Sequence, residues 1–244
     1  MKKFPITIKP FGDSAVLIEW PSQVDGAILN EILDFVDAFK ALGLPQWEMS
    51  VAYHSLTMVH RGEGMDFVDT KELLIDCHKG LKPTENKRKQ HLWTLPVCYD
   101  GEFGIDIMEV CQRLGLSKEE LIDLHTSQQY LVYGIGFLPG FMYLGGLPGS
   151  LEIPRRSAPR SQVAKGSVGL AAKQTGIYPQ ESPGGWNIIG SCPVPLFDPK
   201  ADRPTFVKVG DRVRFQSIER AEYELHKIEA EVGIYKPDKM LLDA

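Results

Sequence analysis

Three arginines stand close together in a chain that is acidic as a whole. The segment from Pro154 to Arg160 reads PRRSAPR, whereas the 244-residue chain carries a formal net charge of -5. A guanidinium presents a planar fork of donors that matches a carboxylate or a phosphate, and the prolines lower the cost of ordering that contact. The segment is therefore a candidate anion-binding site, with Arg160 favoured because Pro159 fixes its approach. The alternative is a solvated turn, or an arginine paired with a neighbouring carboxylate.

Aromatic residues alternate with Gly and Pro upstream of the arginines. Residues 136–146 read GFLPGFMYLGG and include Phe137 and Tyr143. Glycine lets the backbone approach another group closely, and proline stiffens a turn. The pattern indicates the rim of a pocket with aromatic walls, in which Phe137 and Tyr143 contact a ligand. A barrel corner packed by aromatic residues is the structural alternative.

Polar and aromatic side chains of several kinds follow downstream, framed by Gly and Pro. They are Gln174, Thr175, Tyr178, Glu181, Ser182 and Trp186. Such side chains can line a pocket that binds an amide or an acid through a few directed polar contacts. Glu181 would serve as a general acid or base if it were buried. Alternatively, Gln174 and Thr175 satisfy buried backbone groups and Trp186 fills the barrel.

His125 is the histidine that lies near these clusters in the sequence. It is a candidate for proton transfer, with a satisfied histidine on a helix as the alternative. The sequence contains no GxxxxGK[ST] phosphate loop and no GxGxxG, HExxH or GxSxG motif, and its cysteines lack zinc-ligand spacing. We therefore expect no metal site, no recognisable ATP loop and an incomplete active site. Such a chain is a subunit that contributes part of a site, or a binding module.

Composition places the chain among ordinary globular proteins, with 43% hydrophobic and 24% charged residues. No basic stripe is present, so we expect no nucleic-acid partner. No apolar run is long enough to span a bilayer, and the start of the chain lacks a signal-like apolar core. We expect the four cysteines to be buried or half-buried free thiols, in a soluble cytoplasmic protein.

Hydrophobic periodicity predicts the secondary structure. Helices are expected over residues 26–43, 65–81, 104–111, 117–127 and 220–232. Strand patterns cover residues 6–9, 15–20, 47–60, 91–99 and 130–137. Ser117 with Glu120 resembles a capping box. Residues 205–215 place a Gly-Asp turn between two strand-like runs and give the strongest hairpin signal.

The pattern of expected elements changes near the middle of the chain. Residues 1–82 read β-β-α-β-α, which predicts a small α+β domain with helices on one face of a sheet. Residues 83–91 are polar and charged and form the expected linker. Residues 92–244 read mainly as short strands joined by Gly-rich turns, which favours a closed or nearly closed barrel.

Several of these segments together resemble the allophanate hydrolase subunit 1 family. The matching segments are residues 11–15, 130–133, 136–147, 154–160, 166–169, 174–179 and 182–190. The family includes KipI-type kinase inhibitors and the B-type subunits of 5-oxoprolinase. The resemblance implies a small N-terminal domain followed by a cyclophilin-like β-barrel.

The resemblance also implies a function. Such a chain pairs with a homologous C subunit, and an A subunit then completes an ATP-dependent enzyme that opens the lactam of 5-oxo-L-proline to L-glutamate. The barrel pocket that holds the lactam would be lined by Arg160, Gln174, Thr175, Tyr178 and Trp186. The alternative is a KipI-type inhibitor whose barrel docks a proline-containing segment of a histidine kinase. A urea-carboxylase or allophanate-type role, with biotin supplied by a partner, is a third hypothesis.

Overall fold

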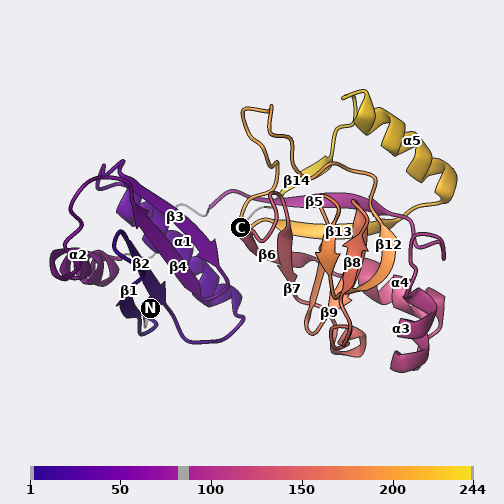
Figure 1. The fold of residues 1–244 in the computed structure, drawn as a ribbon, viewed down its shortest axis with the longest axis horizontal. Helices are drawn as coiled ribbons and strands as arrows, with labels where there is room; N and C mark the ends of the chain where they lie inside the picture. The colour runs from indigo at the N-terminus through magenta and orange to yellow at the C-terminus, as the bar shows by residue number, and fades with distance from the viewer. Residues whose placement is uncertain (1–2, 82–87, 243–244) are drawn as a thin grey trace. The chain divides into compact units, whose positions relative to one another are not determined.

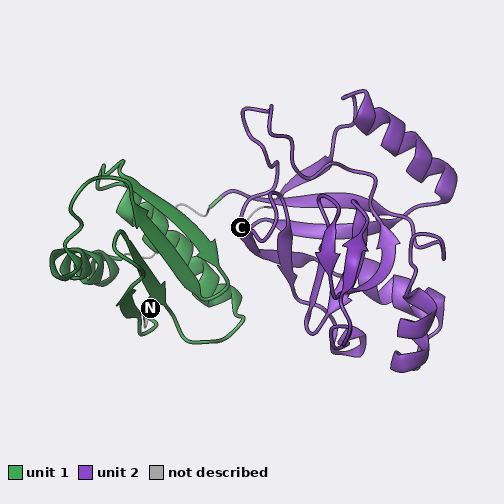
Figure 2. Cartoon of the chain, in the orientation of Figure 1, with its two compact units in different colours: residues 1–88 green, residues 89–244 purple. Residues whose placement is uncertain are grey.

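The computed structural model describes residues 3–81 and 88–242. The chain divides into two compact units, residues 1–88 and residues 89–244 (Figure 2). The linker expected over residues 83–91 falls largely outside the described residues, and its last two positions belong to strand β5, which begins at Gln90.

Unit 1 contains an antiparallel sheet with the strand order β1-β2-β4-β3 (Figure 1). The strands are β1 (Thr7–Pro10), β2 (Ala15–Glu19), β3 (Trp47–Ala52) and β4 (Ser55–His60). Helix α1 (Gly26–Lys40) begins at Asp25, and helix α2 (Phe67–Gly80) begins at Asp66; both aspartates accept first-turn backbone N–H groups. The apolar face of α1 packs with buried residues of β2 and β4. The predicted α+β class of this unit is confirmed.

Unit 2 is mainly β, and its strands pair in a ring. The strands are β5 (Gln90–Val97), β6 (Tyr130–Ile135), β7 (Met142–Gly145), β8 (Arg160–Val163), β9 (Ser167–Ala171), β10 (Gln174–Ile177), β11 (Ser182–Gly184), β12 (Asn187–Ser191), β13 (Arg212–Ser217) and β14 (Asp238–Leu242). Successive pairing runs β5-β13-β6-β7-β10-β9-β12. Cys98 and Ser191 then exchange two backbone hydrogen bonds of 2.9 Å. This bridge joins the end of β12 to the continuation of β5, so the barrel predicted for this half of the chain closes.

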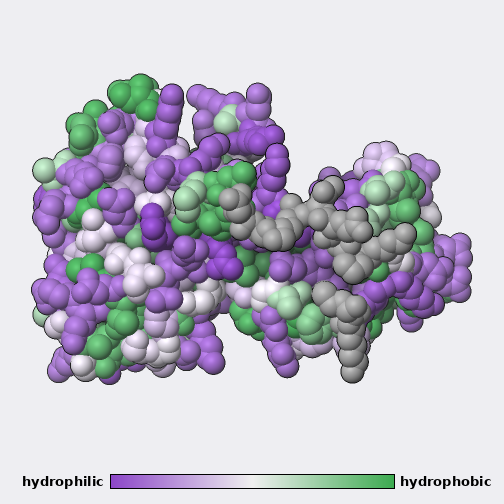
Figure 3. All heavy atoms as spheres, turned by 180° about the vertical axis from the view of Figure 1, so that it is seen from behind, coloured by the Kyte–Doolittle hydropathy of each residue, from purple (hydrophilic) through white to green (hydrophobic). Residues whose placement is uncertain are grey.

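The helices of unit 2 lie around the barrel. Helices α3 (Ile107–Leu114) and α4 (Lys118–Thr126) lie next to each other, and α5 (Arg220–Glu231) lies on the same side of the unit in Figure 1. The start of α5 contacts the residues before α3, because Arg220 pairs with Glu102 and Tyr223 packs on Phe103. The predicted capping box is confirmed, because the Glu120 N–H donates to Ser117 Oγ and the Ser117 N–H donates to the Glu120 carboxylate. Three apolar side chains at helical spacing face solvent along α5 and at its C-cap, namely Leu225, Ile228 and Val232. Figure 3 shows apolar atoms on the surface at that end of the unit.

The hairpin predicted over residues 205–215 is wrong in its first half, since β13 forms without a partner strand from residues 205–208. Both edges of β13 are occupied, in parallel by β5 and antiparallel by β6. Val207 packs into the barrel core instead. Buried Asp211 accepts hydrogen bonds from the Lys208 N–H and from Trp93 Nε1, each at 3.0 Å. These bonds hold the turn before β13 against β5, so the turn does not join two paired strands.

Two further predictions are tested by the fold. The four cysteines are free thiols, half-buried at Cys77 and buried at the other three positions, as expected. Among the described residues, no helix combines the length and apolarity needed to cross a bilayer.

Candidate functional site

A pocket with aromatic walls opens on unit 2, with a cavity of about 120 Å³. We call it the aromatic pocket; its lining residues are Phe137, Phe141, Tyr143, Arg155, Tyr178, Pro183, Gly184, Gly185 and Trp186. Four of them were predicted as binding residues from the sequence. The fold therefore brings together Phe137, Tyr143, Tyr178 and Trp186, which come from separate segments of the chain.

Phe141 is the centre of the aromatic wall. Its ring meets four others edge to face, with centroid distances of 5.8 Å to Phe137, 5.1 Å to Tyr143, 5.7 Å to Tyr178 and 5.5 Å to Trp186. Edge-to-face pairs are the favoured arrangement of aromatic rings and fix their mutual orientation. The wall is thus a preformed surface, and its central residue was not among the predicted site residues.

Glycines in contact with the pocket rings leave room for those rings because they lack a side chain. A Cβ at Gly184 would lie 2.3 Å from Tyr178 Oη, and a Cβ at Gly176 would lie 3.1 Å from the Trp186 ring. Any side chain at these positions would displace a buried ring. The Gly-rich sequence around the pocket therefore serves the close approach of backbone and aromatic side chains.

Phe137 has an unusual backbone conformation at the rim. Its φ is 69°, in the left-handed region that a residue with a bulky side chain rarely adopts. Phe137 is 67% exposed as a residue, although its ring contacts Phe141. A strained conformation that presents an apolar ring to solvent is typical of a binding site rather than of a packed corner.

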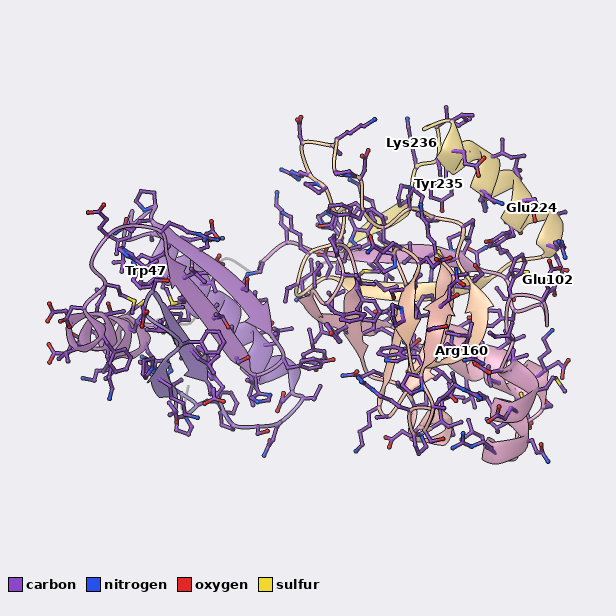
Figure 4. The ribbon with its side chains drawn as sticks, in the orientation of Figure 1. Trp47, Glu102, Arg160, Glu224, Tyr235 and Lys236 are labelled. Atoms are coloured by element: carbon purple, nitrogen blue, oxygen red, sulfur yellow. The ribbon has the colours of Figure 1, made fainter. Side chains whose placement is uncertain are left out.

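Two of the three arginines are bound by Asp106, the residue before α3. Asp106 is 3% exposed. Its Oδ2 accepts from Arg160 Nη1 at 2.9 Å and from the Ile188 N–H at 2.7 Å, and its Oδ1 accepts from Arg156 Nη1 at 3.0 Å. Figure 4 shows Arg160 on β8, on the side of the barrel that carries α3. Arg160, the arginine favoured from the sequence, therefore pairs with a carboxylate of its own chain and is not a pocket-lining residue.

Arg155 differs from its two neighbours. It is exposed and lines the aromatic pocket, and within the described part of the chain it has no hydrogen-bond or ion-pair partner. The backbone on both sides of it is fixed, because the Pro154 carbonyl accepts from Asn187 Nδ2 at 3.0 Å and the Arg156 N–H donates to the Gly185 carbonyl at 2.8 Å. Arg155 is thus a free cation held at the pocket.

Tyr178 supplies a hydroxyl to the pocket. Burial raises the pKa of its phenol, against the opposing effects of the Trp186 backbone and of the charges of Arg155 and Arg160. The phenol therefore keeps its proton at neutral pH and can donate a hydrogen bond to a carbonyl oxygen.

His125 and Thr175 lie in the barrel core and do not line the pocket. The Thr175 hydroxyl donates to the Gly169 carbonyl at 3.1 Å. Thr175 Oγ1 can then accept from His125 Nε2 at 2.9 Å, and His125 Nδ1 accepts from the Tyr99 hydroxyl at 2.6 Å. This arrangement satisfies a neutral imidazole, and burial lowers the pKa of His125 to about 3. Thr175 thus satisfies a buried backbone group, which was the structural alternative for this residue.

The remaining predicted residues lie outside the lining of the aromatic pocket. Glu181 is exposed, so it lacks the burial on which its role as an acid or base depended. Ser182 is buried and donates to the Pro183 carbonyl at 3.2 Å. Gln174 is half-buried at the start of β10. In the described ranges, no group of three or more His, Cys, Asp or Glu side chains lies close enough together to hold a metal ion.

Comparison with known proteins identifies the family. Residues 6–207 match the family described as carboxyltransferase domain, subdomain C and D. Over 242 residues the chain is 36% identical to a protein named as the B subunit of 5-oxoprolinase from Bacillus subtilis, and the alignment covers 91% of this chain and 97% of the relative.

Solved structures agree with this result. The crystal structure of TTHA0988 gives a TM-score of 0.72 at 33% identity, covering 85% of this chain and 40% of that one. The urea carboxylase of Kluyveromyces lactis gives a TM-score of 0.80 at 18% identity, covering 97% of this chain and 24% of that one, which shows a shared fold. The comparisons confirm the resemblance drawn from the motifs: the chain belongs to the family of carboxyltransferase domains, subdomain C and D, together with the proteins named as the B subunit of 5-oxoprolinase.

Proposed function

We propose that the chain is the B subunit of an ATP-dependent 5-oxoprolinase complex and that the aromatic pocket holds the lactam ring of 5-oxo-L-proline, which the complex opens to L-glutamate. The observation that carries the proposal is the aromatic pocket itself. Its cavity of about 120 Å³ suits a single small ring, and its walls combine aromatic surface with few polar groups. The relatives named as the B subunit of 5-oxoprolinase support the same assignment.

The pocket residues would bind and orient the substrate. The ring atoms of the lactam would lie against Phe141 and Trp186, which exclude water from one side of the amide. The protonated Tyr178 hydroxyl would donate to the lactam carbonyl. This contact withdraws electron density from the amide carbon and favours attack on it. Proton transfer by Glu181 or His125 is no part of this proposal, because the former is exposed and the latter is enclosed in the core.

ATP does not fit the aromatic pocket. Nucleotide sites are several times larger than this cavity, and three phosphates need more positive charge than Arg155 supplies. We therefore propose that the aromatic pocket captures the lactam and that ATP binds elsewhere in the complex. The proposed partners are the A and C subunits. The comparisons give no support to the alternative of a histidine kinase inhibitor.

Reconstitution tests the proposal. The A and C subunits from the same genome would be assayed for glutamate formation from 5-oxo-L-proline and ATP, with and without this chain. We expect activity only when the chain is present; full activity of the other two without it would contradict the proposal. Urea and allophanate in place of 5-oxoproline test the third hypothesis in the same assay.

Single hydroxyl deletions locate the site within the chain. Tyr178→Phe should lower kcat/KM for 5-oxoproline about tenfold through loss of one hydrogen bond in a partly desolvated site. Tyr223→Phe is the matched control, since the Tyr223 hydroxyl contacts Ser191 Oγ at 3.1 Å and does not line the aromatic pocket. Equal activity of the two variants would remove Tyr178 from the proposed role.

A further inference from the structure

We infer that Arg155 determines the specificity of the aromatic pocket by binding the carboxylate of its ligand, so that the pocket selects anionic cyclic amides over neutral ones. The inference rests on the proposed function for the identity of the ligand. It assigns anion binding to Arg155, whereas the sequence alone favoured Arg160. It also adds a rule for which ligands the pocket selects.

Charge distribution in the arginine segment separates Arg155 from the other two. Arg160 is neutralised by Asp106, and Arg156 is neutralised by Asp106 and by Glu109 at 3.0 Å. Arg155 lies between the aromatic pocket and a second cavity that Glu109 lines, yet it forms no ion pair with Glu109 or with any other carboxylate in the described residues. One positive charge of the segment is therefore left for a ligand.

The lining of the pocket would favour an anion beside that charge. None of the residues that line the aromatic pocket is Asp or Glu. Arg155 is the one cationic side chain among these lining residues, so a carboxylate in the pocket would have this guanidinium as its partner. A neutral lactam would leave the charge without a partner, and a carboxylate-bearing lactam would supply one.

The backbone position of Arg155 is fixed before any ligand binds. Hydrogen bonds hold Pro154 to Asn187 and Arg156 to Gly185, which is itself a pocket residue. The backbone of Arg155 is thus tied on both sides to the β12 end of the pocket. Only the side chain remains to be ordered, so most of the interaction with a carboxylate contributes to affinity.

Binding measurements on the full-length chain, alone and with the A and C subunits, test the inference. The probes are 5-oxo-L-proline and 2-pyrrolidinone, which has the same lactam ring without the carboxylate. We expect the wild-type protein to bind 5-oxoproline about 10- to 100-fold more tightly than 2-pyrrolidinone, the range for a charged hydrogen bond. Arg155→Met should abolish this preference and leave the affinity for 2-pyrrolidinone unchanged, and Arg155→Lys should restore part of it.

Arg113→Met is the matched control, because Arg113 lines only the neighbouring cavity and forms a loose pair with Glu109. It should retain the full preference for 5-oxoproline. If Arg155→Met keeps the preference while Tyr178→Phe weakens both probes, the lactam pocket stands and the role of Arg155 is overturned. If wild-type protein binds neither probe in either form, the proposed function fails and the inference fails with it.

Discussion

Arg160 and Asp106 form a two-point ion pair, in which Arg160 Nη1 donates to Oδ2 at 2.9 Å and Nη2 donates to Oδ1. The carboxylate is buried, while the guanidinium is about a quarter exposed. The same carboxylate holds Arg156 and the backbone of Ile188. Asp106 therefore fixes the arginine segment to β12.

Removing the charge of Asp106 should destabilise unit 2. Asp106→Asn keeps the shape of the side chain but leaves two arginines without their partner, and the expected loss in the free energy of unfolding is about 3 kcal/mol. Urea denaturation measures it. Glu102→Gln, which breaks the exposed pair between Glu102 and Arg220 (Glu102 is labelled in Figure 4), should cost less than about 1 kcal/mol. Equal stability of the two variants would show that Asp106 does not hold the segment.

His125 should make stability depend on pH. Its folded-state pKa of about 3 lies below its usual value of 6.5. As the pH falls through 6.5, the unfolded chain binds a proton that the folded chain does not bind, so the free energy of unfolding decreases by up to about 1.4 kcal/mol per pH unit. This loss of stability is absent above pH 7, and it grows as the pH falls until the pH reaches the folded-state pKa of His125.

Urea denaturation between pH 7 and pH 5 checks this dependence. His125→Gln can still accept from Tyr99 and donate to Thr175, and it should lose this part of the pH slope. His54→Gln is the control, since His54 is half-buried and lies in unit 1. A slope in His125→Gln equal to that of the control would mean that the pKa of His125 does not change on folding.

Relief of strain at Phe137 should stabilise the protein at the expense of binding. Phe137→Gly removes the cost of a left-handed conformation, and we expect a gain of about 1 kcal/mol in the free energy of unfolding. The loss of the rim aromatic should weaken 5-oxoproline binding about fivefold. Ala172→Gly, at a φ of 51° outside the pocket lining, should give a stability gain without the loss of binding. Unchanged binding in Phe137→Gly would exclude its ring from the site.

Gly184 should tolerate no side chain. The Cβ in Gly184→Ala would lie 2.3 Å from the hydroxyl of Tyr178, whose buried ring has little room to move. We expect a loss of about 2 kcal/mol in stability and loss of 5-oxoproline binding. Gly136→Ala is the matched control, because a Cβ there meets nothing within 4 Å. A thermal shift assay and ligand titration of both variants would show whether the close approach is required.

Local signals in the sequence predicted the elements well. The capping box at Ser117, the amphipathic helix from Gly26 and the Gly-framed short strands are encoded within a few neighbouring residues, and the structure contains them. The hairpin over residues 205–215 was wrong because a distant strand, β5, occupies the edge that the hairpin partner would need.

The site was predictable only in its aromatic part. Phe137, Tyr143, Tyr178 and Trp186 follow from the unusual mixture of aromatic residues and glycines. The choice among the arginines depends on Asp106, which stands 54 residues before Arg160 in the chain. The spacing of the arginines in their segment does not show which of them pair with the Asp106 carboxylate. The absence of an acidic residue beside Arg155 in the pocket could have been noticed only with the fold in hand.

The way in which the barrel closes has a consequence for how the protein folds. Trp93 of β5 is bound by Asp211, 118 residues later, and the ring is completed between Cys98 and Ser191. Unit 1 instead joins β1 to β2 and β3 to β4 through short turns. Pairing between distant segments is slow because the loop between them must be ordered first. Unit 2 should therefore be the slower unit to fold, and until β12 reaches β5 its open edges are the part of the chain most prone to aggregate.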